Sequence, residues 1–288
     1  MKSKKGSLLL ILLIYIIAFG AGGAFLRAFS AFFHPLLALF IADAIATVIV
    51  FIFNMILKNA SVYDPYWSVQ PVFIIGAMYC RYGLSFQIPQ LLILIPLACW
   101  SFRLTLNWIA GFENMDWEDW RYRELKSKNP RLSQFIVFTG IMMMPTCLVF
   151  LGTIPVWYLL QMEHINPVLP AIGGAIILTG VCFEHLADSR MRRYKKNPNR
   201  CPYIDEGLWR YSRHPNYLGE ILIWVGIFIA GLVNFHIFSI AGVLLIALLF
   251  IFISIPMMER HILEKYPEYA MYQKTVRPLV FAPRRKGG

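Results

Sequence analysis

Long apolar stretches recur along the chain, and they constrain its fold more than any other feature. A helix that crosses the hydrocarbon core of a bilayer needs about 20 predominantly apolar residues. Such segments lie at roughly residues 7–28, 35–57, 66–80, 87–110, 133–160, 168–188, 216–233 and 236–257. The third is short, and a re-entrant segment is an alternative there. The sequence therefore predicts an all-α, multi-pass transmembrane bundle of about eight spans.

The composition supports this fold class. Of the 288 residues, 58% are hydrophobic and 15% are charged, whereas soluble domains are about half apolar and a quarter charged. The 15% aromatic content, and the 19 Gly and 17 Pro without a period, exclude a disordered or collagen-like chain. We expect a multi-pass integral membrane protein, located in the inner membrane if the host is bacterial.

The basic residues predict the orientation. The formal net charge is +11, from 27 Lys and Arg against 16 Asp and Glu. With the N-terminus inside, 24 of the 27 bases fall in cytoplasmic segments. They are Lys2, Lys4, Lys5 and Lys58, five bases between Gly111 and Arg131, eight between Asp188 and His214, and seven from Arg260 onward. Only Arg27 and Arg81 lie outside, and Arg103 lies within a span. By the positive-inside rule, both termini are cytoplasmic.

We expect residues 1–30 to form an extra N-terminal transmembrane helix, and residues 31–288 to form a single transmembrane domain. A cleaved signal peptide is the alternative for the first span, which follows Lys2, Lys4 and Lys5 and ends near Gly20–Ala24. The apolar core is long for a signal peptide and no clear A-x-A site follows, which favours a retained helix.

Several other kinds of site are not indicated. The five cysteines are odd in number and form no C-x-x-C, so neither a disulfide framework nor a thiolate site is expected. No H-x-x-x-H pair suggests a metal, and no Rossmann or P-loop glycine motif is present. A nucleic-acid partner is not expected, because the bases are confined to the membrane side.

Ionisable residues within spans are costly and are functional candidates by default. The main ones are Asp43, Arg103, Glu184, Glu220 and Glu259, and all but Asp43 lie near cytoplasmic span ends. Each could instead extend its charged group to the interface. Their clustering toward one side of the membrane favours a shared polar site.

Two adjacent segments predict a phosphate-binding corner. Glu184, Asp188, Arg192 and Lys195 recur at helical spacing and form one stripe where the sixth span leaves the membrane. The seventh span starts near Pro215, which places Asn216 and Glu220 on one face of its first turn. Helix N-termini attract anions, and the bases Arg210, Arg213 and His214 precede this one. The alternative is that these bases only enforce topology and contact anionic lipid.

The same residues carry a resemblance to a known family. The matching segments are Phe183–Asp188, Gly207-Leu-Trp-Arg-Tyr-Ser-Arg-His-Pro-Asn-Tyr-Leu-Gly-Glu220, Glu259-Arg-His, Tyr266-Pro-Glu-Tyr269, Arg103-Leu-Thr-Leu-Asn107 and Glu118-Asp-Trp-Arg-Tyr122. Over roughly residues 60–283 the chain resembles the membrane steroid 5α-reductase family, especially its bacterial relatives. Those proteins are seven-helix membrane enzymes with a cytoplasmic C-terminus.

The resemblance implies that NADPH binds in the C-terminal half, at about residues 168–283, facing the cytoplasm. The cofactor-binding residues predicted from the resemblance and the corner together are Asp119, Arg121, Tyr122, Glu184, Asp188, Arg192, Lys195, Arg213, His214, Asn216, Tyr217, Glu220 and Glu259. No metal is expected.

The implied reaction is reduction of an enone lipid, most simply a 3-oxo-4-ene steroid. It needs a proton donor at the carbonyl oxygen, and the candidates are Asp64, Tyr63 and Tyr66. Alternatively, Asp64 caps a helix and Tyr66 belongs to an aromatic belt. The substrate-binding candidates are Trp67, Trp100 and Arg103. The eukaryotic steroid enzymes carry a Tyr three residues before the corresponding Arg, whereas this chain has Trp100 there.

Two other functions fit parts of the pattern. Arg213-His-Pro-Asn-Tyr-Leu-Gly219 also resembles the isoprenylcysteine carboxyl methyltransferases, which use S-adenosylmethionine. The Asp188 stripe and Asn216 with Tyr217 favour the reductase, and the many bases suit a 2′-phosphate. A non-catalytic lipid-binding protein leaves the polar corner unexplained. We expect a monomer whose partners are a lipophilic small-molecule substrate and membrane lipids.

Overall fold

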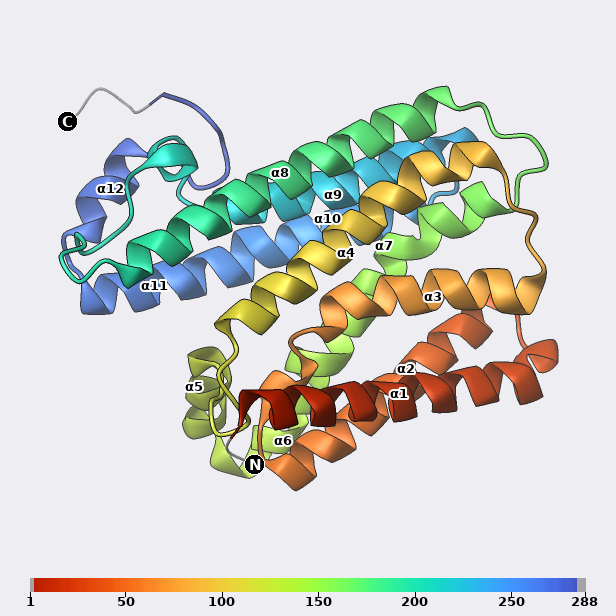
Figure 1. Cartoon of the computed structure of the whole chain (residues 1–288), viewed down its shortest axis with the longest axis horizontal. Helices are drawn as coiled ribbons and strands as arrows, with labels where there is room; N and C mark the ends of the chain where they lie inside the picture. Colours follow the sequence, from red (N-terminus) through yellow and green to blue (C-terminus); the bar gives the residue numbers. More distant parts are fainter. Residues whose placement is uncertain (1–2, 284–288) are drawn as a thin grey trace. The chain divides into compact units, whose positions relative to one another are not determined.

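The computed structural model describes residues 3–283, which contain helices and no β-strand. Lys2 and the bases at 284–286, which contribute to the orientation prediction, lie outside the described residues. The α-helices, in chain order, are α1 (Lys4–Phe29), α2 (Pro35–Leu57), α3 (Tyr66–Tyr82), α4 (Leu91–Gly111), α5 (Trp120–Lys128), α6 (Ser133–Ile136), α7 (Met144–Leu160), α8 (Val168–Lys196), α9 (Pro215–Gly231), α10 (Ser239–Leu249), α11 (Ile255–Lys265) and α12 (Tyr269–Thr275) (Figure 1).

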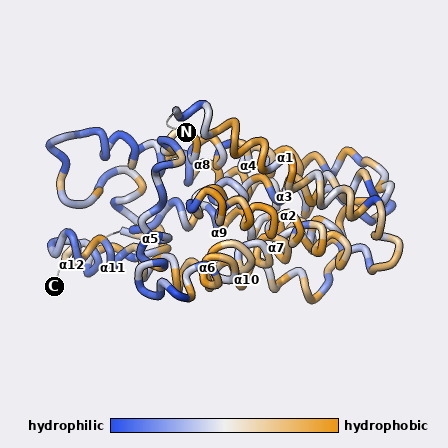
Figure 2. The backbone as a smooth tube through the Cα atoms, turned by 90° about the horizontal axis from the view of Figure 1, so that it is seen from below, coloured by the Kyte–Doolittle hydropathy of each residue, from blue (hydrophilic) through white to orange (hydrophobic). Residues whose placement is uncertain are grey.

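The predicted fold class is confirmed. Across the described residues, seven continuous helical segments are long and apolar enough to cross a membrane. Some of them join two of these helices, as Ser239–Lys265 joins α10 and α11. They correspond to seven of the eight predicted spans. The remaining segment is α3, which has 17 residues and contains Pro71, so its length is about 26 Å against a hydrocarbon core of about 30 Å. Figure 2 shows the apolar character of the long helices and the hydrophilic character of α5 and α12. The protein is a multi-pass integral membrane protein.

Local sequence signals explain where several helices begin and end. Ser3 caps α1, because its hydroxyl accepts a hydrogen bond from the backbone N–H of Gly6 at 3.2 Å. Pro35 and Pro215 occupy the first turns of α2 and α9, where a missing N–H costs nothing. The end of α3 is set by Gly83, whose φ of 59° is in the left-handed region that glycine adopts easily.

The chain divides into two compact units. Unit 1 comprises Met1–Phe86 and Leu104–Glu163, and unit 2 comprises Gln87–Arg103 and His164–Gly288. In unit 1, α1 packs against α2 so closely that a Cβ on Gly22 would lie 2.7 Å from the carbonyl oxygen of Ala42. The residues predicted to form an extra N-terminal helix thus form α1, and its Ile14 and Ala18 are buried in unit 1.

In unit 2, α8 and α9 pack through pairs of glycines. A Cβ on Gly180 would lie 2.5 Å from the carbonyl oxygen of Gly219, and one on Gly173 would lie 2.4 Å from that of Gly226. Small residues let transmembrane helices approach with their backbones almost in contact. Here they bring Glu184 of α8 against α9, since its Cγ would be 2.7 Å from a Cβ on Gly219.

Two segments, Val137–Met143 and Phe250–Ser254, are wound as π-helix. Each comes shortly before a proline, Pro145 in α7 or Pro256 in α11. A proline ring clashes with the carbonyl four residues earlier in an α-helix and cannot donate to it. The wider winding therefore continues each helix past a residue that would otherwise break it.

Candidate functional site

The polar centre of unit 2 is an arginine bound by two acids. Arg103, on α4, donates through Nη2 to Glu184 and through Nη1 to Oδ2 of Asp188 at 2.8 Å. The arginine side chain is 12% exposed, and those of Glu184 and Asp188 are 4% and 16% exposed. Glu184 and Asp188 are one turn apart on α8, so these two members of the predicted stripe face the same arginine.

A third acid lies on α9 next to this group. Glu220 accepts hydrogen bonds from two indole N–H groups, at 3.1 Å from Trp100 and 3.1 Å from Trp224. The two indoles meet edge to face, with centroids 5.5 Å apart. Trp100 is fully buried. Its indole N–H donates to the buried Glu220, which a phenylalanine in this position could not do.

The stripe on α8 continues toward the helix end with bases. Arg192 donates to Ser189 at 3.0 Å, and Lys195 is exposed on the last turn. At the start of α9, the Oδ1 atom of Asn216 is buried and accepts no hydrogen bond from the residues that the structure describes. A buried amide oxygen without a partner costs about 1–3 kcal/mol, and this atom has its capacity to accept a hydrogen bond unused.

Arg213 and His214 contact protein groups. Arg213 bonds both oxygens of Glu259 on α11, at 2.7 and 3.2 Å, and the carbonyls of Gln273 and Val276 at 2.8 and 2.5 Å. His214 bonds the same carboxylate through Nε2 at 2.8 Å. Burial lowers the pKa of His214, while Glu259 opposes that shift. This cluster attaches α11 and the C-terminal segment to the start of α9.

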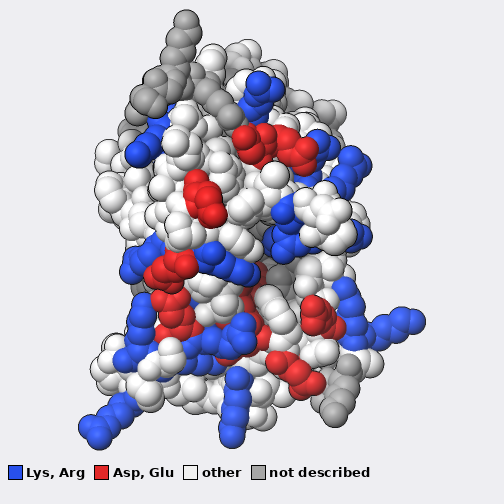
Figure 3. Space-filling model, turned by 90° about the vertical axis from the view of Figure 1, so that its left-hand side faces the viewer, with Lys and Arg blue, Asp and Glu red and all other residues white. Residues whose placement is uncertain are grey.

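Tyr217 completes this end of unit 2. Its ring stacks on His214, with centroids 5.3 Å apart and an angle of 6° between the planes, and packs against Phe250 at 4.9 Å. Figure 3 shows that the face on the left of Figure 1 carries many Lys and Arg side chains, with Asp and Glu between them.

Unit 1 holds the candidate proton donors in two separate hydrogen-bond networks. In the first, Asp64 accepts from the hydroxyl of Tyr122 at 2.5 Å and from the indole of Trp108 at 3.3 Å. Burial raises the pKa of Asp64 to about 6, although the bond from Tyr122 and the charge of Arg121 act in the opposite direction. Asp64 is thus a carboxyl group that changes protonation near neutral pH.

The loop before α5 brings Tyr122 to Asp64. Asn59 donates to the carbonyls of Met115 and Trp117, each at 2.8 Å, and the backbone N–H of Ala60 donates to Glu118 at 2.7 Å.

Asp119 and Arg121 form a local pair at the start of α5. Asp119 caps the helix by accepting from the backbone N–H of Arg121 at 2.9 Å, and also bonds its Nε at 2.8 Å. Burial alone would raise the pKa of Asp119, but the bonds and charge of Arg121 lower it below its usual value.

The second network surrounds Asp43 on α2, which is fully buried. Its carboxylate accepts from the hydroxyl of Tyr66 at 2.9 Å and from the amide of Gln70 at 2.6 Å. Tyr63 shares a hydrogen bond of 2.7 Å with Thr146 of α7, and the Tyr63 and Tyr66 rings stack at 4.9 Å. The Asp43 carboxyl group is thus fully buried and accepts from two neutral donors of α3, with no base within bonding distance among the contacts above.

The structure thus groups the predicted residues as follows. Arg103, Glu184, Asp188, Glu220 and Trp100 meet at one centre, and Asp64 meets Tyr122 at another. Trp67 is half-buried and packs against the core of unit 1. Among the described residues, no group of three potential metal ligands is present.

Sequence reasoning missed several participants: Trp108, which donates to Asp64, and four others, Trp224, Gln70, Thr146 and Gln273. For Trp224 a signal existed, because it lies four residues after Glu220 and therefore on the same helix face. Gln70 had a similar signal, being four residues after Tyr66. The other two come from helices far away in the sequence.

The profile of one protein family, described as "Protein of unknown function (DUF1295)", matches residues 50–276 of the chain. An uncharacterized protein of Schizosaccharomyces pombe, C594.04c, is 28% identical over 263 residues, which cover 80% of this chain and 74% of that protein. No solved structure matches the chain.

Proposed function

The chain belongs to the DUF1295 family of proteins of unknown function, and we propose that it is a membrane-embedded, NADPH-dependent reductase of an enone lipid. The most direct substrate class is a 3-oxo-4-ene steroid or sterol-like ketone. The observation that carries the proposal is the change of charge along one face of α8, next to the unpartnered Asn216 oxygen at the start of α9.

The deep end of this face has more acid than base. Arg103 is shared by Glu184 and Asp188, and Glu220 is bound only by neutral indole donors among the contacts described above. Such a site favours a ligand that offers hydrogen-bond donors, because each unpaired buried carboxylate is costly. Ribose hydroxyls and a nicotinamide carboxamide supply donors of this kind, and carboxylates recognise ribose in many dinucleotide sites.

The shallow end of the same face is basic. Arg192 and Lys195 follow Asp188 by four and seven residues, which places them about 6 and 10 Å further along the helix. Phosphates would bind at these two bases and at the N-terminus of α9, where free backbone N–H groups and the dipole favour anions. The oxygen of Asn216 would accept from a donor of the bound nucleotide.

Bound NADPH would supply a hydride to the β-carbon of the enone. The residues of the chain would supply the proton donor at the ketone oxygen, where negative charge develops. Asp64 is one candidate, since its raised pKa lets it carry a proton near neutral pH. Tyr63 and Tyr66 are the other candidates. The Tyr66 hydroxyl donates to Asp43 in the structure, and this bond keeps the hydroxyl proton in a fixed position. Direct contact of Trp67, Trp100 or Arg103 with substrate remains a prediction.

The proposal is tested by nucleotide binding to the detergent-solubilised protein. NADPH should raise Tm and bind with a measurable Kd, and S-adenosylmethionine should do neither. Asn216→Ala and Glu220→Gln should each weaken NADPH binding about tenfold or more, because each removes or weakens an acceptor for the nucleotide. A tenfold loss corresponds to about 1.4 kcal/mol. Asn199→Ala, in an exposed loop of the same unit, is the matched control.

The alternatives give different results. Stabilisation by S-adenosylmethionine alone would indicate the methyltransferase, and no shift with either ligand would indicate a protein without this enzymatic function. Turnover of a 3-oxo-4-ene steroid by the Asp64→Asn, Tyr63→Phe and Tyr66→Phe variants then identifies the donor: its variant should lose activity while keeping NADPH affinity.

A further inference from the structure

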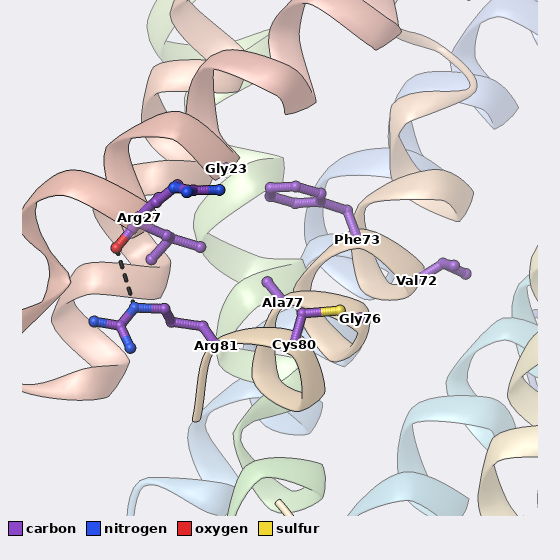
Figure 4. Close-up of a pocket in the computed structure, with 9 residues that line it drawn as sticks. Gly23, Arg27, Val72, Phe73, Gly76, Ala77, Cys80 and Arg81 are labelled. Atoms are coloured by element: carbon purple, nitrogen blue, oxygen red, sulfur yellow. Dashed lines mark hydrogen bonds between the residues drawn. The ribbon is translucent and has the colours of Figure 1, made fainter. Parts of the chain in front are cut away.

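A cavity that is separate from the polar clusters described above lies in unit 1 between α1 and α3. It has a volume of about 600 Å³, within the range of small-molecule sites. It is lined by Gly23, Leu26, Arg27, Val72, Phe73, Gly76, Ala77, Cys80 and Arg81 (Figure 4). The lining is thus mostly apolar, with two arginines and no acid.

Both arginines line the cavity. Arg81 donates through Nε to the carbonyl of Leu26 at 3.2 Å and to the hydroxyl of Ser30 at 2.6 Å. Arg27 comes from the last turn of α1 and extends over the cavity toward Phe73 (Figure 4). Neither is paired with an Asp or Glu within the described part of the chain. Two guanidinium groups without counter-charge beside an apolar groove attract an anion.

The glycines keep the groove open. A Cβ built on Gly23 or on Gly76 would meet no atom within 4 Å. Neither glycine is therefore required for close helix packing, in contrast to Gly22, where a Cβ would lie 2.7 Å from the carbonyl oxygen of Ala42. The lining covers Gly23–Arg27 of α1 and Val72–Arg81 of α3, about 6 and 14 Å along the two helices, which is room for part of an acyl chain.

These arginines are also exceptional in the predicted topology. Arg27 and Arg81 are the two bases at the outer ends of spans, against the general preference for bases inside. A base at a helix C-terminus is favoured by the helix dipole, but that effect does not require an adjoining groove. In the predicted outer loops Glu163 is the one acid, so another copy of the chain offers little negative charge to this site.

We propose that the groove binds an anionic phospholipid of the outer leaflet. The phosphate lies between Arg27 and Arg81, and one acyl chain lies over Gly76 and Phe73. This site is independent of the proposed reductase activity. A zwitterionic lipid of the same chain length binds less well, because its cationic headgroup meets two arginines.

Native mass spectrometry of the purified full chain, with phosphatidylglycerol or phosphatidylcholine of identical acyl chains, tests the proposal. We expect at least tenfold tighter binding of phosphatidylglycerol. Arg27→Gln should remove most of that preference. Gly76→Leu, which fills the groove while favouring the helix, should weaken both lipids. Arg131→Gln, an exposed base in the same unit, should leave binding unchanged.

Other outcomes overturn the proposal. Equal binding of the two lipids, or an unchanged preference in Arg27→Gln, would remove the charge argument. Displacement of the lipid by millimolar inorganic phosphate would show a simple anion site without a role for the acyl chain. A dimer that excludes lipid and is lost in Glu163→Gln would show that a second copy occupies the groove.

Discussion

The hydroxyl of Tyr122 donates a 2.5 Å hydrogen bond to Asp64, across 58 positions of sequence. The bond joins the segment before α3 to α5, which lies within the loop between α4 and α6. It also joins a candidate proton donor, Asp64, to a predicted cofactor-binding residue, Tyr122. A change at either position should therefore affect the other.

The pKa of Asp64 predicts a pH dependence of stability. Burial raises this pKa from 3.8 to about 6 in the folded protein, so the folded state binds the proton more tightly than the unfolded state. The stabilisation is complete below pH about 4 and is lost as pH rises through about 6. Asp64→Asn should flatten Tm against pH across this window. Asp116→Asn, at an exposed position, is the control and should leave the dependence of Tm on pH unchanged. An identical slope of Tm against pH in Asp64→Asn and in the parent chain would contradict the raised pKa of Asp64.

Removing Arg103 alone should destabilise the protein more than removing Arg103 together with one of its acids. Arg103→Gln leaves Glu184 and Asp188 without their base, and removing one partner of a buried pair costs about 3–5 kcal/mol. The double variant Arg103→Gln/Glu184→Gln should recover part of the loss. Arg190→Gln breaks a pair whose side chains are 42% and 48% exposed and should cost under about 1 kcal/mol. Thermal unfolding in detergent measures all three, and equal losses for Arg103→Gln and Arg190→Gln would contradict the burial of the first pair.

Close packing of α8 on α9 should make Gly180 intolerant of any side chain. Gly180→Ala places a Cβ 2.5 Å from a backbone oxygen, and overpacking of this kind costs about 1–3 kcal/mol. Gly20→Ala, on α1, meets no atom within 4 Å and should be stabilising by about 0.5–1 kcal/mol. The two Tm shifts should thus have opposite signs; a loss in both would point to the helices' general need for glycine.

Glu259 should control how firmly the C-terminal segment is attached. Glu259→Gln removes the charge that Arg213 and His214 share, so the carbonyls of Gln273 and Val276 lose a well-positioned donor. Trypsin should then cleave after Lys274 several-fold faster. Glu264→Gln, exposed on the same helix, should cleave at the parent rate. No acceleration in Glu259→Gln would show that other contacts hold the segment.

Helical periodicity made part of this arrangement predictable. Glu184 and Asp188 are on one face because they are one turn apart, and Pro215 marks the start of α9 because its lost N–H is harmless there. The contact between Glu220 and Trp100 was not predictable in the same way, since Trp100 lies 120 positions earlier. Only the packing of α4 within unit 2 brings them together.

The same limit applies to Asp43. The sequence marks it as a costly acid in a span, but its donors come from α3, and Thr146 reaches the same network from α7. The 17-residue length of α3 also explains why its status as a span was uncertain from hydropathy. Its polar residues, such as Gln70, face the buried network and lower the apolar character of the segment.

The π-wound segment Val137–Met143 should let the chain lose one residue there without disturbing the rest of the helix. A π-type turn holds one residue more than an α-type turn, so it absorbs an additional residue without rotating the helix on either side. Deleting one residue there, together with Pro145→Ala, should give a regular helix that still presents Thr146 to Tyr63. The same deletion in the middle of α8 would turn half of that helix by about 100°. Insertions and deletions among relatives should therefore collect before Pro145 and Pro256 and be absent between Gly173 and Asp188.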